Sequence, residues 1–311
     1  METFSIPSLA QEIQTEADAY RVLENLRWKG EPVCPHCGAT AAYFIRPLNG
    51  SSRRTRTGAQ TERRLWKCKA CRKQFSVITN TIMHGTKVPI RTWVFVLLEM
   101  VSSKNGVAAR EIERKYHVTP RTAWHMTCRV REAMKSDPLA PLFSGVVQAD
   151  EMYVGKRQKG AGTGHLDKVP VVTVVEEGGR AKSTVVQRSF QAPQVVIDYT
   201  DPEATVVTDE ASIYFDLDQF VAKHATVNHG KKEWVRGGYT TNTVEGFFGQ
   251  VRRSISGTHH RVTNKHVARY MAEFDFRYST RKTTDSERLR TLLDQVGDKR
   301  LPYDVLRGKS A

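Results

Sequence analysis

Two Cys-x-x-Cys pairs constrain the fold of this chain more than any other feature. The first is Cys34-Pro-His-Cys37, and the second, Cys68-Lys-Ala-Cys71, follows after 30 intervening residues. Two such knuckles supply the four thiolates of a tetrahedral structural zinc site. A redox dithiol is the alternative, but it needs only one pair and a βαβ context. We therefore predict a zinc ribbon at 32–88, with all four cysteines as zinc ligands.

The charge balance predicts a polyanionic partner. The 311 residues carry 48 Lys and Arg against 33 Asp and Glu, a formal net charge of +15, and such an excess favours nucleic acid. Between Arg46 and Lys73 there are ten Lys or Arg and one acid, Glu62. A basic run is often only solvated surface, but on a zinc ribbon this one is well suited to phosphate contacts with DNA.

A membrane surface is the competing partner. The longest apolar run, Trp93-Val-Phe-Val-Leu-Leu98, is far shorter than the roughly 20 residues that span a bilayer. The N-terminus lacks the basic and apolar regions of a secretory signal, and the Cys-x-x-Cys pairs do not resemble a disulfide framework. We expect a cytoplasmic, nucleoid-associated protein without a membrane partner.

The first part of the chain is predicted to be largely helical outside the ribbon. Apolar residues at helical spacing indicate helices at 9–29, 90–103, 107–116 and 120–134. We assign 1–31 to an N-terminal helix and 89–136 to a DNA-binding region.

The last two of these helices form a helix-turn-helix pattern. A short turn separates them, and Thr119 with Pro120 makes a favourable N-cap and N1 pair. The second helix would present three side chains to a major groove: Arg121, Thr122 and His125. Any helical hairpin can imitate this pattern, so a purely structural hairpin stays open.

The periodicity changes after Asp137-Pro-Leu-Ala-Pro141, which marks a domain boundary. Short runs rich in β-branched residues predict strands at 145–154, 169–175, 184–190, 204–209 and 225–228. A helical segment is expected up to about residue 220, and a last long helix at 264–281. The loop that begins at Lys156 is rich in Gly and Lys, and we expect it to be mobile and to face DNA.

Two aspartates stand near the ends of predicted strands, and each is followed by a glutamate. Asp150 precedes Glu151, and Asp209 precedes Glu210. Since side chains alternate along a strand, the glutamates should face away from whatever the aspartates face. A strand-end aspartate is most often a turn former. Together with a third acid on a helix, however, the two would suit a pair of divalent ions in a ribonuclease H-like sheet.

The third acid lies in a predicted helix at 240–253. Glu245 and Arg252 are seven residues apart, two turns along one face, beside an apolar stripe. One could offer its charge to a metal and the other to a phosphate. The structural alternative is a capping box, because Asn242 precedes Glu245 by three residues.

These elements together resemble bacterial insertion-sequence transposases of the group related to eukaryotic Merlin transposons. The zinc ribbon, the helix-turn-helix and three short motifs occur in the same order: Ala149-Asp-Glu-Met-Tyr-Val-Gly155, Val207-Thr-Asp-Glu210 and Thr241-Asn-Thr-Val-Glu-Gly-Phe-Phe248. The similarity covers about residues 15–282. It implies an α/β fold, with a ribonuclease H-like mixed sheet flanked by helices at 142–282. The remaining residues, 283–311, are charged and weakly periodic, and we expect a short terminal helix and a C-terminal tail there.

The resemblance also implies site residues. Asp150 and Asp209 would be the first and second ligands of two Mg²⁺ or Mn²⁺ ions, and Glu245 the third. Arg252 stands where such enzymes carry a basic residue seven after the glutamate, often Lys. Some relatives use Asn as the third polar group, so Asn242 stays in reserve as a ligand.

The same resemblance implies a DDE-type transposase that frees a 3′-hydroxyl at a transposon end and joins it to target DNA. Arg252, Arg253 and Lys156 would contact DNA, as would His229 and Trp234, although packing explains Trp234 equally well. Joining two DNA ends requires two active sites, so we expect a homodimer or larger assembly on DNA. Two alternatives stay open: a DNA-binding regulator with an inactive second domain, and a nuclease of the same fold that cuts without joining.

Overall fold

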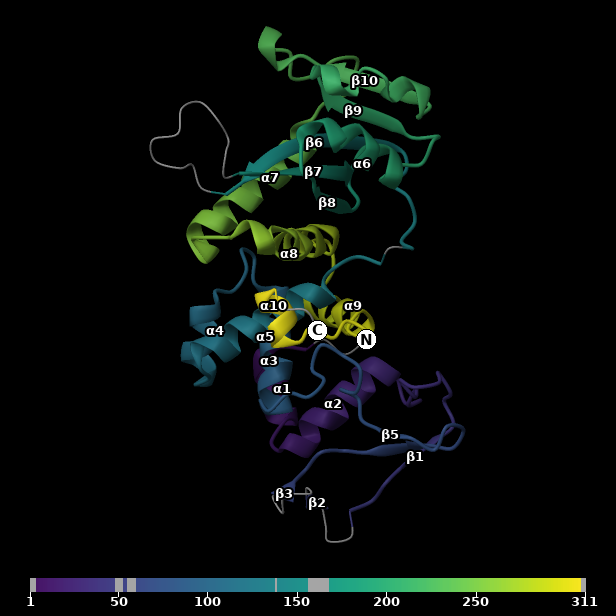
Figure 1. Cartoon of the computed structure of the whole chain (residues 1–311), viewed down its shortest axis with the longest axis vertical. Coiled ribbons are helices and arrows are strands. Elements are labelled where there is room, and N and C mark those ends of the chain that lie inside the picture. The colour runs from purple at the N-terminus through teal and green to yellow at the C-terminus, as the bar shows by residue number, and fades with distance from the viewer. Residues whose placement is uncertain (1–3, 48–52, 55–59, 138, 156–167, 309–311) are drawn as a thin grey trace. The chain divides into compact units, whose positions relative to one another are not determined.

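The computed structural model describes residues 4–47, 53–54, 60–137, 139–155 and 168–308 (Figure 1). The chain divides into two compact units. Unit 1 contains Met1–Ser103, Ala109–Ala133 and Thr283–Ala311, and unit 2 contains Lys104–Ala108 and Met134–Lys282. The chain therefore enters unit 2 twice, briefly at 104–108 and then at 134–282, and returns to unit 1 each time.

Unit 1 combines helices with small antiparallel sheets. Its helices are α1 (Ile6–Glu12), α2 (Glu16–Trp28), α3 (Ile90–Ser102), α4 (Ala109–Tyr116), α5 (Pro120–Ala133), α9 (Asp285–Asp294) and α10 (Tyr303–Arg307). A three-stranded sheet has the order β1 (Ala42–Phe44), β4 (Trp66–Cys68), β5 (Gln74–Phe75), and β2 (Arg53–Arg54) pairs with β3 (Gln60–Thr61).

Two parts of unit 1 differ from the prediction. The helix expected at 9–29 is two helices, because the Thr15 hydroxyl accepts from the Asp18 N–H in a capping box that starts α2 anew. The segment 283–311, expected to hold one short helix and a tail, contains two helices, α9 and α10, whose leucines are buried although their periodicity in the sequence is weak.

Unit 2 is built on a five-stranded mixed sheet with the order β10-β9-β6-β7-β8. Its strands are β6 (Val146–Val154), β7 (Val169–Glu176), β8 (Ala181–Val185), β9 (Thr205–Asp209) and β10 (Lys223–Val227). β6 runs parallel to β9 and antiparallel to β7. The predicted α/β class with a ribonuclease H-like mixed sheet is confirmed.

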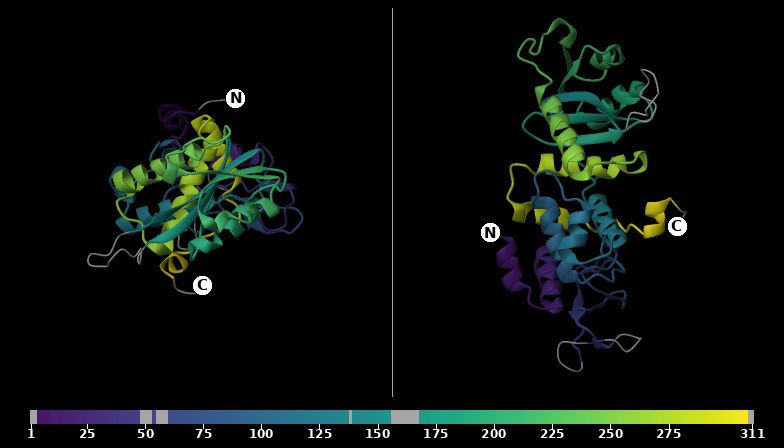
Figure 2. Two further views of the ribbon diagram at one scale, coloured as in Figure 1. Left: turned by 90° about the horizontal axis from the view of Figure 1, so that it is seen from above. Right: turned by 90° about the vertical axis from the view of Figure 1, so that its left-hand side faces the viewer.

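Helices cover both faces of this sheet (Figure 2, left). One face packs against α6 (Ala192–Tyr199) through a buried cluster that includes Val147, Ala149 and Val196. The other packs against α7 (Asn242–Ser254) and α8 (Val267–Ser279), through a second cluster that includes Met152 and Val154. Alternate residues of β6 therefore face different helical layers, as the pleat of a strand requires.

The sequence did not predict α6, and it extended the third strand over 184–190, where the structure ends β8 at Val185. The helical segment expected before residue 220 consists of two short 3-10 turns, Ser212–Tyr214 and Leu217–Gln219. Where residues are described, no helix combines the length and apolar character that a bilayer crossing demands.

Candidate active site and zinc site

The four predicted zinc ligands lie together in unit 1. The Sγ atoms of Cys34, Cys37, Cys68 and Cys71 all lie within 4.8 Å of one another, with 3.7 Å between Cys34 and Cys71 and 3.6 Å between Cys37 and Cys68. Among the described residues, no other group of three or more Cys, His, Asp or Glu residues is gathered so tightly. Four thiolates in this arrangement match a structural zinc site.

Local backbone geometry prepares these cysteines for a metal. The residue after each knuckle, Gly38 and Arg72, adopts a positive φ of 74° and 62°, which turns the chain back. The Cys71 N–H donates to Cys68 Sγ at 3.4 Å and lowers the pKa of that thiol to about 7. A lowered pKa favours the thiolate, the form that binds zinc.

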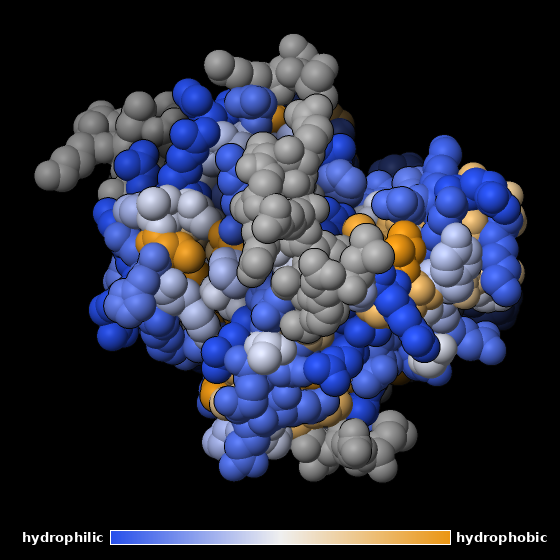
Figure 3. All heavy atoms as spheres, turned by 90° about the horizontal axis from the view of Figure 1, so that it is seen from below, coloured by the Kyte–Doolittle hydropathy of each residue, from blue (hydrophilic) through white to orange (hydrophobic). Residues whose placement is uncertain are grey.

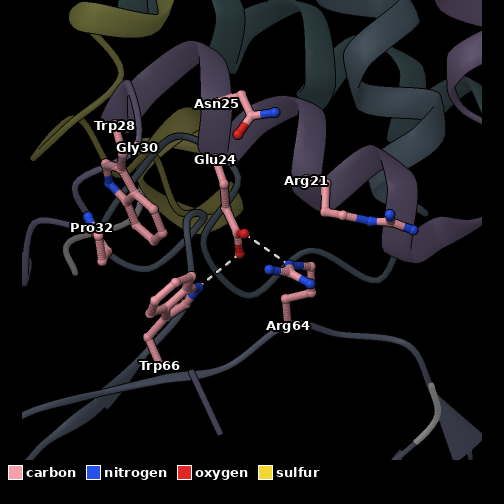
Figure 4. A pocket seen from close by; sticks show the side chains of 8 residues that line it. All are labelled: Arg21, Glu24, Asn25, Trp28, Gly30, Pro32, Arg64 and Trp66. Atoms are coloured by element: carbon pink, nitrogen blue, oxygen red, sulfur yellow. Dashed lines mark hydrogen bonds and ion pairs between the residues drawn. The ribbon is translucent and has the colours of Figure 1, made fainter. Parts of the chain in front are cut away.

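Helix α2 supports the sheet that carries the second knuckle (Figure 4). Glu24 is only 6% exposed, and its carboxylate accepts from Arg64 Nε at 2.8 Å and Trp66 Nε1 at 2.9 Å. These side chains line a cleft of about 220 Å³. Both carboxylate oxygens already have partners, so the cleft is best explained as part of the packing between α2 and β4.

In unit 2 the two predicted aspartates occupy equivalent positions on neighbouring strands. The last paired residues of β6 and β9 are Gln148 and Val207, in parallel register. Asp150 and Asp209 each lie two residues further along, so both side chains point to the sheet face on which α7 packs.

Glu151 lies within β6, where alternation directs it to the face opposite Asp150, whereas Glu210 follows the last residue of β9 and lies outside the strand. Glu151 accepts a hydrogen bond from the Tyr214 hydroxyl, in the 3-10 turn after β9. Glu210 accepts from the backbone N–H groups of His229 and Gly230, both at 3.0 Å. Both glutamates therefore hold the loops that border the site.

The pKa of Asp150 reflects its buried, acidic surroundings. Burial, followed by the nearby carboxylates of Asp209, Glu151 and Glu245, raises its pKa to about 7, against a lowering by the Glu151 N–H. Desolvation and neighbouring like charges both disfavour the ionised form of a carboxyl group. Such an oxygen-rich, negatively charged donor set suits Mg²⁺ or Mn²⁺.

Glu245 lies in the first turn of α7, and its side chain is 41% exposed. Its Oε1 accepts from the Thr241 hydroxyl at 3.0 Å and lies 3.1 Å from His229 Nε2. The N-cap of α7 is Thr241, so the capping box that Asn242 and Glu245 could have formed is not present. Asn242 is exposed.

The residues predicted to contact DNA have different surroundings. On α5, His125 Nε2 lies 2.9 Å from the Leu301 carbonyl, Arg121 lies over the Tyr303 ring, and Thr122 Oγ1 lies 2.9 Å from Thr119 Oγ1. The C-terminal segment thus shares the helix face assigned to the major groove. Arg252 and Arg253 are exposed in the last turn of α7, and Lys156 lies outside the described residues.

The surface seen from below is predominantly hydrophilic, with hydrophobic residues in separate small patches (Figure 3). A surface of this kind is compatible with a highly charged partner.

Three residues at the site were not predicted. Tyr214 and Thr241 gave no signal in the sequence, since each is defined by a long-range or cap contact. Gln148 did give one: it precedes Asp150 by two residues in a predicted strand, so alternation places both on one face.

Comparison with known protein families matches two domain models. Residues 14–74 match a transposase zinc-ribbon domain, and residues 142–279 match an ISXO2-like transposase domain. No curated protein matches the chain. The first match covers the four-cysteine cluster, and the second covers the mixed sheet with Asp150, Asp209 and Glu245. The chain therefore contains a transposase zinc-ribbon domain and an ISXO2-like transposase domain, the two domains expected of an insertion-sequence DDE transposase.

Proposed function

We propose that Asp150, Asp209 and Glu245 are the catalytic carboxylates of this DNA transposase. One observation carries the proposal: Asp150 and Asp209 lie at equivalent positions on adjacent parallel strands, on the face against which the Glu245 helix packs. The three acids come from separate elements on one side of the sheet, and burial, followed by the charges of neighbouring carboxylates, raises the pKa of Asp150.

The three carboxylates would hold two Mg²⁺ or Mn²⁺ ions. Bound there, such ions activate a water or hydroxyl and stabilise the leaving oxygen of an in-line phosphodiester displacement. Among the described residues the four cysteines form the one tight group of metal-ligating side chains, so the carboxylate site is proposed from strand register and the packing of α7.

The proposed reaction has two steps of the same kind. Water attacks the phosphorus at the transposon end, the P–O3′ bond breaks, and the proton ends on the freed 3′-hydroxyl. The oxygen of that 3′-hydroxyl then attacks a phosphorus of target DNA, the target's own P–O3′ bond breaks, and the hydroxyl proton ends on the freed 3′-oxygen of the target. Because each step exchanges one P–O bond for another, no further reactant is needed.

Residues of this chain would orient Glu245 and hold the DNA phosphate. Thr241 and His229 contact Oε1 of Glu245, and within the described part of the chain Oε2 has no such contact, so that oxygen can accept a ligand. Arg252, two turns along α7, is suited to hold a phosphate. Asn242 is a second candidate for the third ligand, since it is exposed at the start of the same helix.

Transfer of two DNA ends requires two active sites, so we propose a homodimer or larger assembly on DNA. A regulator with an inactive domain would not need three converging acids. A nuclease of the same fold would need them, and only its products distinguish it from a transposase.

The test is cleavage of DNA that carries the element's own ends, with Mg²⁺ or Mn²⁺. Wild type is compared with Glu245→Gln and Asn242→Ala. Loss of cutting in the Glu245 variant alone supports the three acids, and joined products distinguish a transposase from a nuclease. Loss of cutting only in the Asn242 variant would identify Asn242, rather than Glu245, as the third ligand. Binding without any cutting would favour the regulator.

A further inference from the structure

We infer that Gln148 is a positioning residue that fixes the Glu245 helix to the strand carrying Asp150. The inference rests on the proposed function for its catalytic consequence, but the contact itself is independent of it. Gln148 is 1% exposed, and it lies in β6 on the same face as Asp150, two residues earlier.

The side chain of Gln148 caps α7 from outside the helix. Its Oε1 accepts from the backbone N–H of Thr243 at 2.9 Å and from that of Val244 at 3.1 Å. The first N–H groups of an α-helix have no partner within the helix. A buried oxygen that accepts two of them satisfies the start of α7 and defines where this start lies.

The residue that would ordinarily perform this capping is used for something else. Thr241 is the N-cap of α7, yet its side chain makes no capping hydrogen bond. Its hydroxyl instead donates to Glu245 Oε1 at 3.0 Å. The cap is thus supplied by the strand, and the threonine is left to orient the acid.

This division of roles couples the positions of two of the proposed catalytic acids, Asp150 and Glu245. Gln148 and Asp150 belong to one rigid strand, and Glu245 follows Val244 directly in the helix that Gln148 holds. The position of Glu245 relative to Asp150 therefore depends on the Gln148 contact. A misplacement of about 1 Å in such a site can reduce the rate about 10²-fold.

The experiment compares Gln148→Met, which keeps the shape and loses the acceptor, with Gln148→Glu, which restores an acceptor. A matched control is Gln191→Met. Gln191 Oε1 also accepts two backbone N–H groups, from Gln187 at 2.9 Å and Arg188 at 3.1 Å, but in a turn away from the acids. If Gln148→Met does not fold, the shorter Gln148→Asn replaces it.

Two measurements are made on the zinc-loaded full chain. The first is amide hydrogen exchange at Thr243 and Val244, which should accelerate in Gln148→Met and not in Gln191→Met. The second is calorimetric binding of Mn²⁺ alone. We expect Gln148→Met to weaken it about 10- to 100-fold, as for residues that orient metal ligands, with Gln191→Met close to wild type. Gln148→Glu adds a charge beside Asp150, so it is compared by amide exchange alone, where it should stay close to wild type.

The outcomes separate the two proposals. Unchanged amide exchange and unchanged Mn²⁺ affinity in Gln148→Met would overturn the positioning role. Equal losses in Gln191→Met would also overturn it, since the effect would then be general destabilisation. If wild type binds no Mn²⁺ and cuts no DNA, the proposed function fails, and the exchange rates alone decide whether Gln148 holds the helix.

Discussion

The zinc site and the carboxylate site are assembled in different ways. The four cysteines come from two knuckles, each four residues long, and their sulfur atoms lie within 4.8 Å of one another. The three acids come from two strands and a helix, and they form no comparably tight group. The first site is specified locally, and the second depends on the packing of a whole sheet.

The difference concerns what holds each site together. At the cysteine site the metal supplies much of the folding free energy, because a small ribbon has little core of its own. At the proposed carboxylate site the fold must hold several like charges near one another without the help of an ion. The surrounding contacts of Glu151, Glu210 and Gln148 serve this purpose.

The largest effect is expected from Cys68→Ser. Loss of one thiolate should release zinc and unfold the ribbon, since structural zinc contributes roughly 10 kcal/mol or more. Zinc content and the thermal unfolding midpoint report this. Cys128→Ser is the matched control, because Cys128 is a buried thiol outside the four-cysteine cluster. A folded, metal-free Cys68→Ser would show that the ribbon does not need its ion.

The next largest effect is expected from Asp150→Asn and Asp209→Asn. Each should lower DNA cleavage at least about 10³-fold, since a metal ligand supplies several kcal/mol of transition-state stabilisation. DNA binding and folding should persist, because the change removes a charge from a cluster of acids. Asp198→Asn, on α6, is the control. Cutting at the wild-type rate would remove the mutated residue from the site.

A smaller effect is expected from His229→Ala. Glu245 would lose the contact with His229 Nε2 at 3.1 Å but keep the Thr241 hydroxyl, so we expect cleavage to fall about 10- to 100-fold. Trp234→Ala provides the comparison. The Trp234 ring lies 4.8 Å from that of His229 and is 54% exposed. If both variants lose DNA affinity equally, the pair contacts DNA rather than positioning Glu245.

The sequence predicted what is encoded locally. The Cys-x-x-Cys spacing identified the zinc site, and β-branched runs placed β6, β7 and β9 within a few residues of their bounds. Strand alternation correctly placed Glu151 on the face of β6 opposite Asp150. These predictions depend on periods of two residues and on fixed spacings, which a single sequence displays directly.

The sequence did not predict what depends on distant partners. Helix α6 was missed because it is short, has proline in its first turn and is rich in β-branched residues. The face of α5 was assigned to DNA without knowledge of Leu301 and Tyr303, which follow more than 160 residues later. The capping of α7 by Gln148 spans 95 residues, and no local pattern contains it.

The smallest effect is expected from a change to Asp275, an acid in the core rather than at the proposed metal site. Asp275 on α8 accepts from the N–H and hydroxyl of Ser183. Burial raises its pKa to about 7, although these bonds and the Lys182 charge oppose the shift. The folded state thus holds this proton more tightly than the unfolded state, whose pKa is near 4.

The stability that Asp275 contributes by holding this proton is fully present below about pH 4 and is lost as the pH rises toward 7. Asp275→Asn should remove that decline and raise stability at pH 8 by on the order of 1 kcal/mol. Thermal unfolding from pH 5 to 8 is the measurement, with Asp198→Asn as control. Cleavage and Mn²⁺ binding should not change. If the pH profile of Asp275→Asn matched that of wild type, Asp275 would already be ionised in the folded chain. Ser183 and Lys182 would then be sufficient to stabilise its buried charge.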